Sequence, residues 1–201
     1  MRYLDTGAMY RALTWWMLRE GVDVTDASAV TAAADRPAIV IGTVADRESV
    51  TVDGIDVTRA IRSREVTNSV SAVSAVPAVR TRLAAMQRRL VTEAIASDRG
   101  IVVEGRDIGT VVVPDAQVKV FLTASEGTRA ARRAADLAAD PAVTVTLTRE
   151  ELARRDRFDS TRTVSPLLKA DDAVEIDTTE TGLDDVIGKI VELAQRRTVS
   201  A

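Results

Sequence analysis

The sequence predicts an α/β fold in which a parallel sheet is flanked by helices. Short apolar runs of strand length alternate along the chain with segments whose apolar residues recur at helical spacing, a pattern typical of βα units. One stretch, 36–60, changes to a period of two and predicts a small antiparallel insertion. With 201 residues, 46% of them hydrophobic and 28% charged, the chain is long and apolar enough to bury a core.

The first elements follow from apolar spacing and from residues that begin or end helices. We expect a short strand that ends at Asp5, followed by an amphipathic helix over 7–20. Thr6 is the expected N-cap of this helix, and Gly21 is expected to end it. A second, shorter helix is predicted over 27–34.

Within the insertion at 36–60, the dipeptide Asp53-Gly54 separates two alternating apolar runs. This dipeptide is a strong signal for a tight hairpin, because both of its residues tolerate a positive φ. Helical spacing returns after the insertion and predicts two helices, over 63–74 and 78–97.

The second half of the chain continues the α/β pattern. The apolar run 101–103 predicts a buried strand, and a loop over 104–109 follows it. The remaining predicted elements are a strand over 118–122, a helix capped by Ser125, a helix opened by a capping box of Thr148 and Glu151, a strand over 173–176 and a helix over 182–197.

The chain contains neither cysteine nor histidine, and this excludes several kinds of site. A Ser-His-Asp triad, a cysteine nucleophile, a disulfide and a zinc site of thiolate or imidazole ligands all need residues that the chain lacks. A general base must be a carboxylate or a lysine, and a metal ion must be held by oxygen, which favours Mg²⁺ or Ca²⁺. The 27 basic residues are almost all arginines, whose planar guanidinium suits phosphate and carboxylate groups.

Ligands of parallel sheets bind beyond the carboxyl ends of the strands, so the loops at those ends are candidate sites. In the first such loop, Arg11 is either a phosphate ligand or a solvated surface charge, and Thr6 is either a ligand or only a helix cap. In the second, Arg106 and Asp107 form a charge cluster between two glycines directly after a strand, which favours a ligand site over a mere turn.

A third cluster of charges lies near the end of the chain, over 154–162. If this segment is helical, Arg155, Asp159 and Arg162 share one face because they are spaced i, i+4 and i+7. The alternative is a ladder of surface ion pairs, each of which contributes only a few tenths of a kcal/mol.

Five segments together resemble the bacterial cytidylate kinases, which belong to the P-loop nucleoside-monophosphate kinases. They are YLDTGAMYRA (3–12), REVTNSVSAVSAVPAVR (64–80), VVEGRDIGTVVVPDA (102–116), VKVFLTAS (118–125) and RRDRFDSTR (154–162). The resemblance implies one nucleotide-kinase domain over 1–201 that transfers the γ-phosphoryl group of ATP to CMP or dCMP with Mg²⁺. It also implies that 36–60 is a CMP-side insertion and that about 127–162 is a helical lid.

The resemblance further assigns roles to individual residues. It implies base contacts by Thr6, Arg80 and Asp107, ribose contacts by Ser71, Arg155 and Asp159, acceptor-phosphate contacts by Arg11, Arg106 and Arg162, and ATP contacts by Arg132 and Arg133. Among these, Arg106, Arg155 and Arg162 are the expected catalytic residues, because a phosphoryl-transfer enzyme acts chiefly by positioning its substrates and stabilising charge. The ligands of Mg²⁺ stay open.

The chain departs from the family pattern in one respect, since it has no Gly-x-x-x-x-Gly-Lys phosphate loop. Its one Gly-Lys pair, Gly188-Lys189, lies in the predicted last helix. We therefore expect that the first strand and the phosphate loop are missing upstream of the segment at Tyr3, and that this chain is unstable or poorly active.

Three other functions stay open: a non-catalytic CMP-binding fragment, a kinase for another nucleoside monophosphate such as UMP or AMP, and an arginine-rich RNA-binding protein. The net charge of −3 and the 3% aromatic content argue against nucleic acid as a partner. No secretory signal and no apolar run of membrane-spanning length is visible, so we expect a cytoplasmic protein that binds no membrane. It is expected to be a monomer.

Overall fold

The computed structural model describes the chain except for residues 98, 137–148, 150–151, 155, 158–163 and 199–201. The chain divides into two compact units, Met1–Ile108 and Gly109–Ala201, and each is described by itself. Helices and parallel strand pairs occur in both units, which confirms the predicted α/β class. Within the described residues, no helix is both long and apolar enough to cross a membrane.

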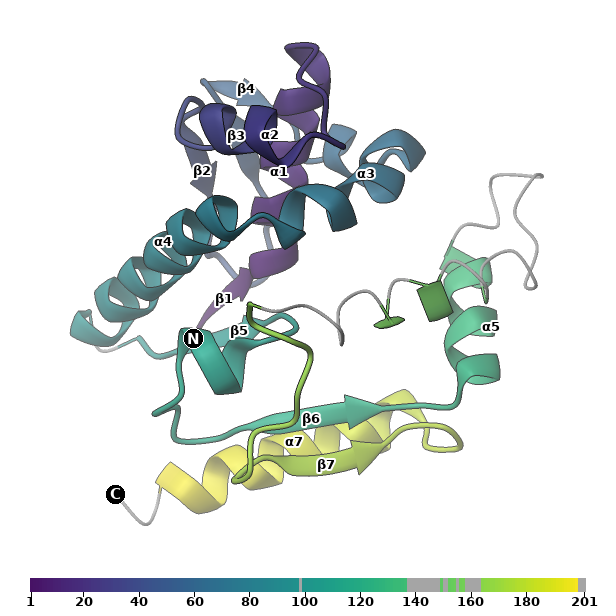
Figure 1. Ribbon diagram of the computed structural model, residues 1–201. Coiled ribbons are helices and arrows are strands. Elements are labelled where there is room, and N and C mark those ends of the chain that lie inside the picture. The colour runs from purple at the N-terminus through teal and green to yellow at the C-terminus, as the bar shows by residue number, and fades with distance from the viewer. Residues whose placement is uncertain (98, 137–148, 150–151, 155, 158–163, 199–201) are drawn as a thin grey trace. The chain divides into compact units, whose positions relative to one another are not determined.

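The first unit is built on a parallel pair of strands. Strand β1 (Arg2–Asp5) pairs with β5 (Ile101–Glu104), in a register that sets Arg2 against Ile101 and Asp5 against Glu104. Strand β1 runs directly into helix α1 (Thr6–Arg19), as Figure 1 shows. The strand and the helix are those predicted from the sequence.

The predicted N-cap of α1 is wrong by one residue. Asp5 is the N-cap, and its Oδ1 accepts a hydrogen bond from the backbone N–H of Ala8 at 3.1 Å. The hydroxyl of Thr6 instead donates to the backbone carbonyl of Glu104. An aspartate and a threonine are both good N-caps, so the sequence alone did not decide which of the two adjacent residues takes the role.

The antiparallel insertion is present in the first unit. Strands β2 (Ile39–Ile41), β3 (Val50–Val52) and β4 (Ile55–Asp56) form one sheet in the order β2-β3-β4. Asp53 and Gly54 have φ values of 50° and 78°, so the hairpin is the tight turn that their sequence predicts.

Five helical segments surround these strands. They are α1, α2 (Ala27–Ala33), the short 3₁₀ helix η1 (Ala60–Arg62), α3 (Arg64–Ala75) and α4 (Pro77–Ala96). The four α-helices agree with those predicted from spacing, and η1 was not predicted. Leu4 of β1 is fully buried together with Leu13, Met17, Ile61 and Leu83 from the helices. These side chains form one apolar core, which supplies the main stabilisation of the unit.

The apolar run 101–103 predicted a buried strand, but in the structure β5 is buried on one face only. Ile101 and Val103 pack against the core, whereas Val102 is 50% exposed. Successive side chains of a strand point to opposite faces, so only alternate residues of the run reach the core.

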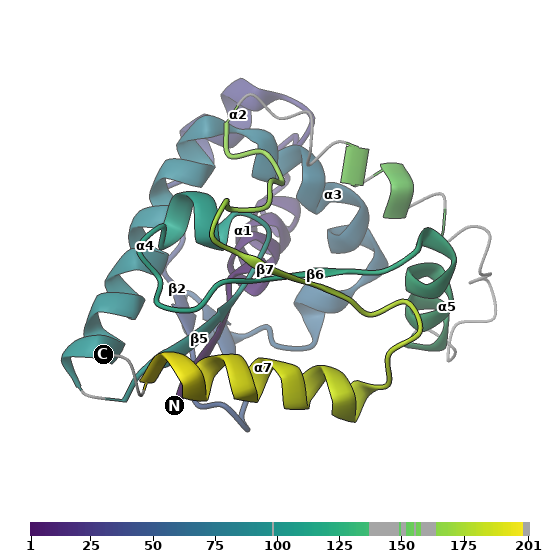
Figure 2. The same ribbon diagram turned by 90° about the horizontal axis from the view of Figure 1, so that it is seen from below.

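The second unit contains a second parallel pair. Strand β6 (Val120–Thr123) pairs with β7 (Val174–Asp177), and helix α7 (Leu183–Thr198) runs alongside them (Figure 2). Helix α5 (Glu126–Asp136) begins after Ser125, whose hydroxyl accepts from the N–H of Thr128 at 3.2 Å, and this confirms the predicted cap. A π-helical turn, Ile108–Val112, joins the two units.

Two sequence predictions concern residues that the structure describes only in part or not at all. The capping box of Thr148 and Glu151 lies outside the described residues. The predicted lid, about 127–162, begins within α5, and much of its remainder lies outside the described residues.

Candidate active site

The loop after β5 packs directly on the start of α1. Thr6 is 3% exposed, and its Oγ1 donates to the backbone carbonyl of Glu104 at 2.7 Å. Gly105 follows immediately, and a Cβ atom added there would overlap Thr6 Oγ1 and lie 2.7 Å from Ile108 Cδ1. Any larger residue would clash here, so close packing against Thr6 and Ile108 requires a glycine at position 105.

Arg80 and Asp107 form a buried ion pair in the first unit. Nη2 of Arg80, on α4, bonds to Oδ2 of Asp107, and Nη1 donates to the backbone carbonyl of Ser74 at 3.1 Å. Arg80 is 4% exposed and Asp107 is 8% exposed. The structure thus brings together two of the three residues expected at the base, and breaking such a buried pair typically costs about 3–5 kcal/mol.

The aromatic ring of Tyr10 lies beneath the Arg80 guanidinium, 5.5 Å from its carbon to the ring centroid. This geometry is a cation–π contact, and it holds the Arg80 guanidinium in addition to its bonds with Asp107 and the Ser74 carbonyl. Nε of Arg80 is buried and has no hydrogen-bond partner among the described residues. A buried N–H without a partner is costly, so this donor is suited to a ligand acceptor.

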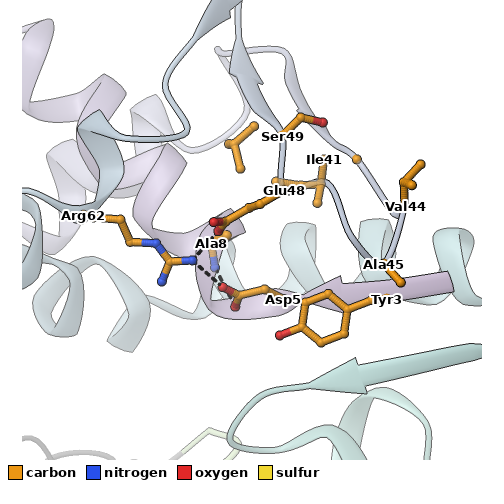
Figure 3. A pocket seen from close by; sticks show the side chains of 11 residues that line it. Tyr3, Asp5, Ala8, Ile41, Val44, Ala45, Glu48, Ser49 and Arg62 are labelled. Atoms are coloured by element: carbon orange, nitrogen blue, oxygen red, sulfur yellow. Dashed lines mark hydrogen bonds and ion pairs between the residues drawn. The ribbon is translucent and has the colours of Figure 1, made fainter. Parts of the chain in front are cut away.

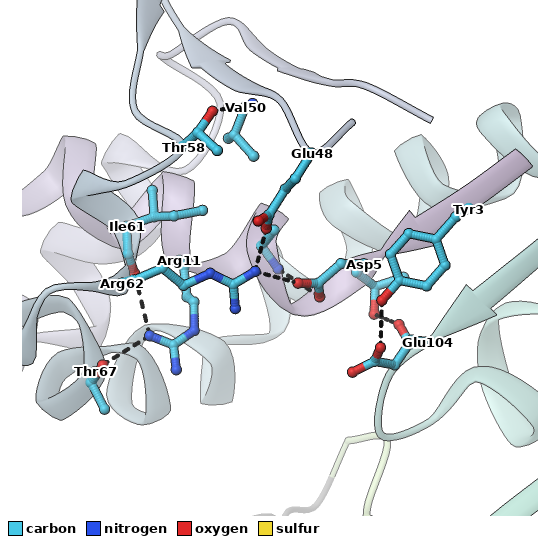
Figure 4. A network of polar contacts seen from close by, with 12 residues as sticks. Tyr3, Asp5, Arg11, Glu48, Val50, Thr58, Ile61, Arg62, Thr67 and Glu104 are labelled. Atoms are coloured by element: carbon cyan, nitrogen blue, oxygen red, sulfur yellow. Dashed lines mark hydrogen bonds and ion pairs between the residues drawn. The ribbon is translucent and has the colours of Figure 1, made fainter. Parts of the chain in front are cut away.

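Arg11 of α1 is 8% exposed, so the alternative of a solvated surface charge is wrong. Its Nη1 donates to Thr67 Oγ1 at 2.9 Å and to the backbone carbonyl of Ile61 at 3.3 Å. Figure 4 shows the guanidinium held between these two acceptors, which come from α3 and from η1.

Helix α3 carries small polar residues at the spacing i, i+4 and i+7: Thr67, Ser71 and Ser74. Residues at this spacing share one face of a helix. Thr67 holds Arg11, the carbonyl of Ser74 holds Arg80, and Ser71 lies between them on the helix. Sequence reasoning named Ser71 but neither Thr67 nor Ser74. Thr67 lies one turn earlier on the same face, but nothing in its spacing indicates that it contacts Arg11, and Ser74 acts through its backbone carbonyl.

The first unit also has a small pocket between β1 and the antiparallel sheet, with a volume of about 170 Å³. Nη2 of Arg62 bonds to Asp5 Oδ2 at 2.9 Å and to a carboxylate oxygen of Glu48, and Figure 3 shows all three side chains lining the pocket. Burial alone would lower the pKa of Arg62, but Glu48 and Asp5 outweigh it and raise that pKa. None of the expected site residues that the structure describes lines this pocket.

Tyr3 also lines the pocket and links β1 to β5 through its side chain. Its hydroxyl donates to Glu104 Oε2 at 2.5 Å. Partial burial of the phenol raises the pKa of Tyr3, and the hydrogen bond and the negative charge of Glu104 raise it further. Tyr3 therefore stays protonated well above neutral pH and acts as a hydrogen-bond donor.

In the second unit, Arg132 of α5 is held at the end of β7. Its Nη1 donates to Thr178 Oγ1 at 2.9 Å, and its Nη2 donates to the Thr178 carbonyl at 2.6 Å. Thr178 Oγ1 in turn donates to the carbonyl of Thr123 at 2.9 Å. Arg133 follows on the same helix and is half-buried.

The other expected site residues fall into two groups. Arg106 is half-buried in the bend between Gly105 and Asp107. Arg155, Asp159 and Arg162 lie outside the described residues. No group of three or more acidic side chains that could hold a metal ion occurs in the part of the chain that the structure describes.

Comparison with known proteins identifies the class to which this fold and this site belong. The family model described as cytidylate kinase matches residues 1–196. A cytidylate kinase of Streptomyces avermitilis is 54% identical over 197 residues, which cover 98% of this chain and 83% of the relative. A cytidylate kinase of Rhodococcus jostii is 54% identical over 198 residues, and one of Mycobacterium leprae is 47% identical over 198 residues; each alignment covers 98% of this chain and 85% of the relative.

The chain therefore belongs to the cytidylate kinase family. This confirms the predicted family and the predicted phosphotransferase class. The roles of the individual site residues stay predictions.

Proposed function

We propose that this chain transfers the γ-phosphoryl group of ATP to CMP or dCMP, which gives ADP and CDP or dCDP. Family membership supports the reaction class. The observation that carries the choice of base is the buried pair of Arg80 and Asp107, because its charged atoms are fixed in one arrangement and withdrawn from water.

The hydrogen-bonding pattern of cytosine suits this pair. The base presents an N4 amino donor, and a carboxylate such as Asp107 accepts from it. Uracil presents a carbonyl oxygen at the same place, so it would set two acceptors against each other and leave a buried group unpaired. The unsatisfied Nε–H of Arg80 supplies a donor to an acceptor on the base edge.

The remaining contacts follow the family resemblance. We propose Thr6 as a further base contact, Ser71, Arg155 and Asp159 at the ribose, Arg11, Arg106 and Arg162 at the acceptor phosphate, and Arg132 and Arg133 at ATP. Phosphoryl transfer depends on positioning and on stabilising the charge of the transferred group, and arginines do both. Mg²⁺ is proposed as the counter-ion of the ATP phosphates.

A second candidate is CMP binding without phosphoryl transfer. One observation favours it: the sequence contains no Gly-x-x-x-x-Gly-Lys, the pattern that cradles donor phosphates in P-loop kinases. The two candidates share the acceptor site and differ only in turnover.

The test measures ADP formation from Mg-ATP with CMP, dCMP, UMP or AMP. Isothermal titration calorimetry measures the binding of the same monophosphates. Asp107→Asn replaces the proposed acceptor of the N4 amino group, and Asp115→Asn is the control because Asp115 is exposed. We expect Asp107→Asn to lower the preference for CMP over UMP at least about tenfold, the value of one charged hydrogen bond. The control should keep the preference of the unchanged protein.

Each outcome separates the candidates. Turnover with CMP supports the kinase, whereas CMP binding without ADP formation supports the second candidate. An unchanged CMP preference in Asp107→Asn would contradict the role given to this carboxylate. Equal binding of CMP, UMP and AMP by the unchanged protein would contradict the proposed base recognition.

A further inference from the structure

We infer that Thr67 is a positioning residue for Arg11, and that it thereby determines how tightly the chain binds the phosphate group of its acceptor. The inference rests on the proposed function, which assigns Arg11 to that phosphate. The observations that carry it are two hydrogen bonds at a single hydroxyl group.

The Thr67 hydroxyl has one proton, and its neighbours fix where that proton points. Oγ1 donates to the backbone carbonyl of Ser63 at 2.9 Å and accepts from Arg11 Nη1 at 2.9 Å. Because a guanidinium has only donors, the oxygen must accept on the side of Arg11. The hydrogen bond to Ser63 directs the proton away, so a lone pair faces the arginine.

A second acceptor also orients Arg11. The backbone carbonyl of Ile61, in η1, accepts from the same Nη1 at 3.3 Å. Thr67 and Ile61 therefore orient the end of a side chain that starts on a different helix, α1 (Figure 4). Both of these acceptors are uncharged oxygens.

Orientation before binding has a direct effect on affinity. A free arginine side chain carries about 2 kcal/mol of rotamer entropy, and ordering it on binding weakens the complex. Bidentate recognition of a phosphate also needs the plane of the guanidinium in one orientation. A hydroxyl that fixes Nη1 in the unliganded protein reduces both costs, so it should strengthen binding of a phosphate and not of a nucleoside.

The alternative is that Thr67 only stabilises α3. A threonine inside a helix commonly bonds the carbonyl four residues earlier, as Thr67 does with Ser63. Thr31 of α2 makes the same bond to the carbonyl of Ala27 at 2.7 Å, and its side chain is exposed. Thr31 is therefore a matched control, because it makes the same helical bond and, among the described residues, its hydroxyl contacts no arginine.

The experiment measures calorimetric dissociation constants for CMP and for cytidine, which lacks the phosphate. Thr67→Val keeps the shape of the side chain and removes the acceptor, whereas Thr67→Ser keeps the hydroxyl. We expect Thr67→Val to weaken CMP binding about fivefold to tenfold and cytidine binding less than about twofold. Thr67→Ser and Thr31→Val should stay within about twofold for both.

A coupling measurement separates positioning from general stability. In an Arg11→Ala background, Thr67→Val should have no further effect on CMP affinity, because the group that it positions is gone. Equal weakening of CMP and cytidine, or an undiminished effect in the Arg11→Ala background, would overturn the inference while leaving the proposed function in place. Failure of the unchanged protein to bind CMP would overturn the proposed function and this inference with it.

Discussion

The two parallel strand pairs, β1–β5 and β6–β7, end in the same way. In the first unit Thr6, the residue after β1, donates its hydroxyl to the carbonyl of Glu104, the last residue of β5, at 2.7 Å. In the second unit Thr178, the residue after β7, donates to the carbonyl of Thr123, the last residue of β6, at 2.9 Å. In each pair, a threonine hydroxyl thus bonds to the last carbonyl of the neighbouring strand, and in the second pair the backbone N–H of Thr178 also bonds to that carbonyl, at 2.8 Å.

An aspartate precedes the threonine in both places, but the two aspartates have different partners. Asp5 caps α1 through the N–H of Ala8. Asp177 accepts from the N–H of Thr179 at 2.8 Å and from its hydroxyl at 2.6 Å, and these hydrogen bonds lower the pKa of Asp177. The first strand end therefore leads directly into a helix, and the second leads into a turn.

The two pairs differ in the burial of one leucine each. Leu4, the third residue of β1, is fully buried, whereas Leu122, the third residue of β6, is 54% exposed. Ile176, the third residue of β7, is only 7% exposed, so the second pair also has a buried position, and its exposed leucine lies on the strand that supplies the carbonyl. We conclude that the local sequence sets how a strand ends, while the packed helices decide how much its side chains contribute to stability.

The largest expected effect comes from shortening these two leucines. Leu4→Ala should lower the free energy of unfolding by about 2–5 kcal/mol, because it leaves a cavity in a closed core. Leu122→Ala should cost less than about 1 kcal/mol, since much of its side chain is already in water. Urea unfolding, monitored by circular dichroism and by tryptophan fluorescence, tests both variants.

The two tryptophans, Trp15 and Trp16, both lie on α1, so their fluorescence reports on the first unit. Leu4→Ala should shift the fluorescence midpoint strongly, whereas Leu122→Ala should leave it in place. Similar losses for the two variants would show that the contrast in burial has no energetic consequence.

The next effect concerns the glycine at the end of β5. Gly105→Ala places a Cβ against Thr6 Oγ1 and Ile108, so it should break the strand-end hydrogen bond and cost about 1–3 kcal/mol. Gly127→Ala is the control, because a Cβ in that helix meets no atom within 4 Å. It should be neutral or slightly stabilising, as alanine favours a helix.

Thermal or urea unfolding of the two glycine variants measures this difference directly. A CMP titration of the same proteins adds a second observation, because the loop of Gly105 also carries Asp107. A stable Gly105→Ala variant that binds CMP normally would contradict the packing argument.

The parts of the fold that depend on local signals were predictable from the sequence. The helix over 7–20 followed from apolar spacing, and the hairpin at Asp53-Gly54 followed from residues that tolerate a positive φ. The choice of Asp5 over Thr6 as the N-cap, and the exposure of Val102, were not predictable, because both depend on which other element lies opposite.

The candidate site shows the same division. The family resemblance named Arg80 and Asp107 as base contacts, and the structure joins them in one buried pair. It named Arg11 but not Thr67, because the contact between them joins residues 56 apart in the sequence. No local periodicity encodes a hydrogen bond across two helices.

The smallest expected effect concerns a side-chain hydrogen bond within the first strand pair, between Tyr3 of β1 and Glu104 of β5. The hydroxyl of Tyr3 donates to Glu104, and the pKa of Tyr3 is raised above its usual value of 10.0, chiefly by burial and then by Glu104. The folded chain holds this proton more tightly than the unfolded chain, so the stability that it adds is complete below pH 10 and is lost as the pH rises above that value. Tyr3→Phe should therefore be slightly less stable than the unchanged protein near pH 8, and urea unfolding should show the difference shrinking at higher pH. Ionisation of the lysines is common to both proteins and cancels in the comparison. A constant difference in stability between pH 8 and pH 11 would show that the phenol does not titrate with folding.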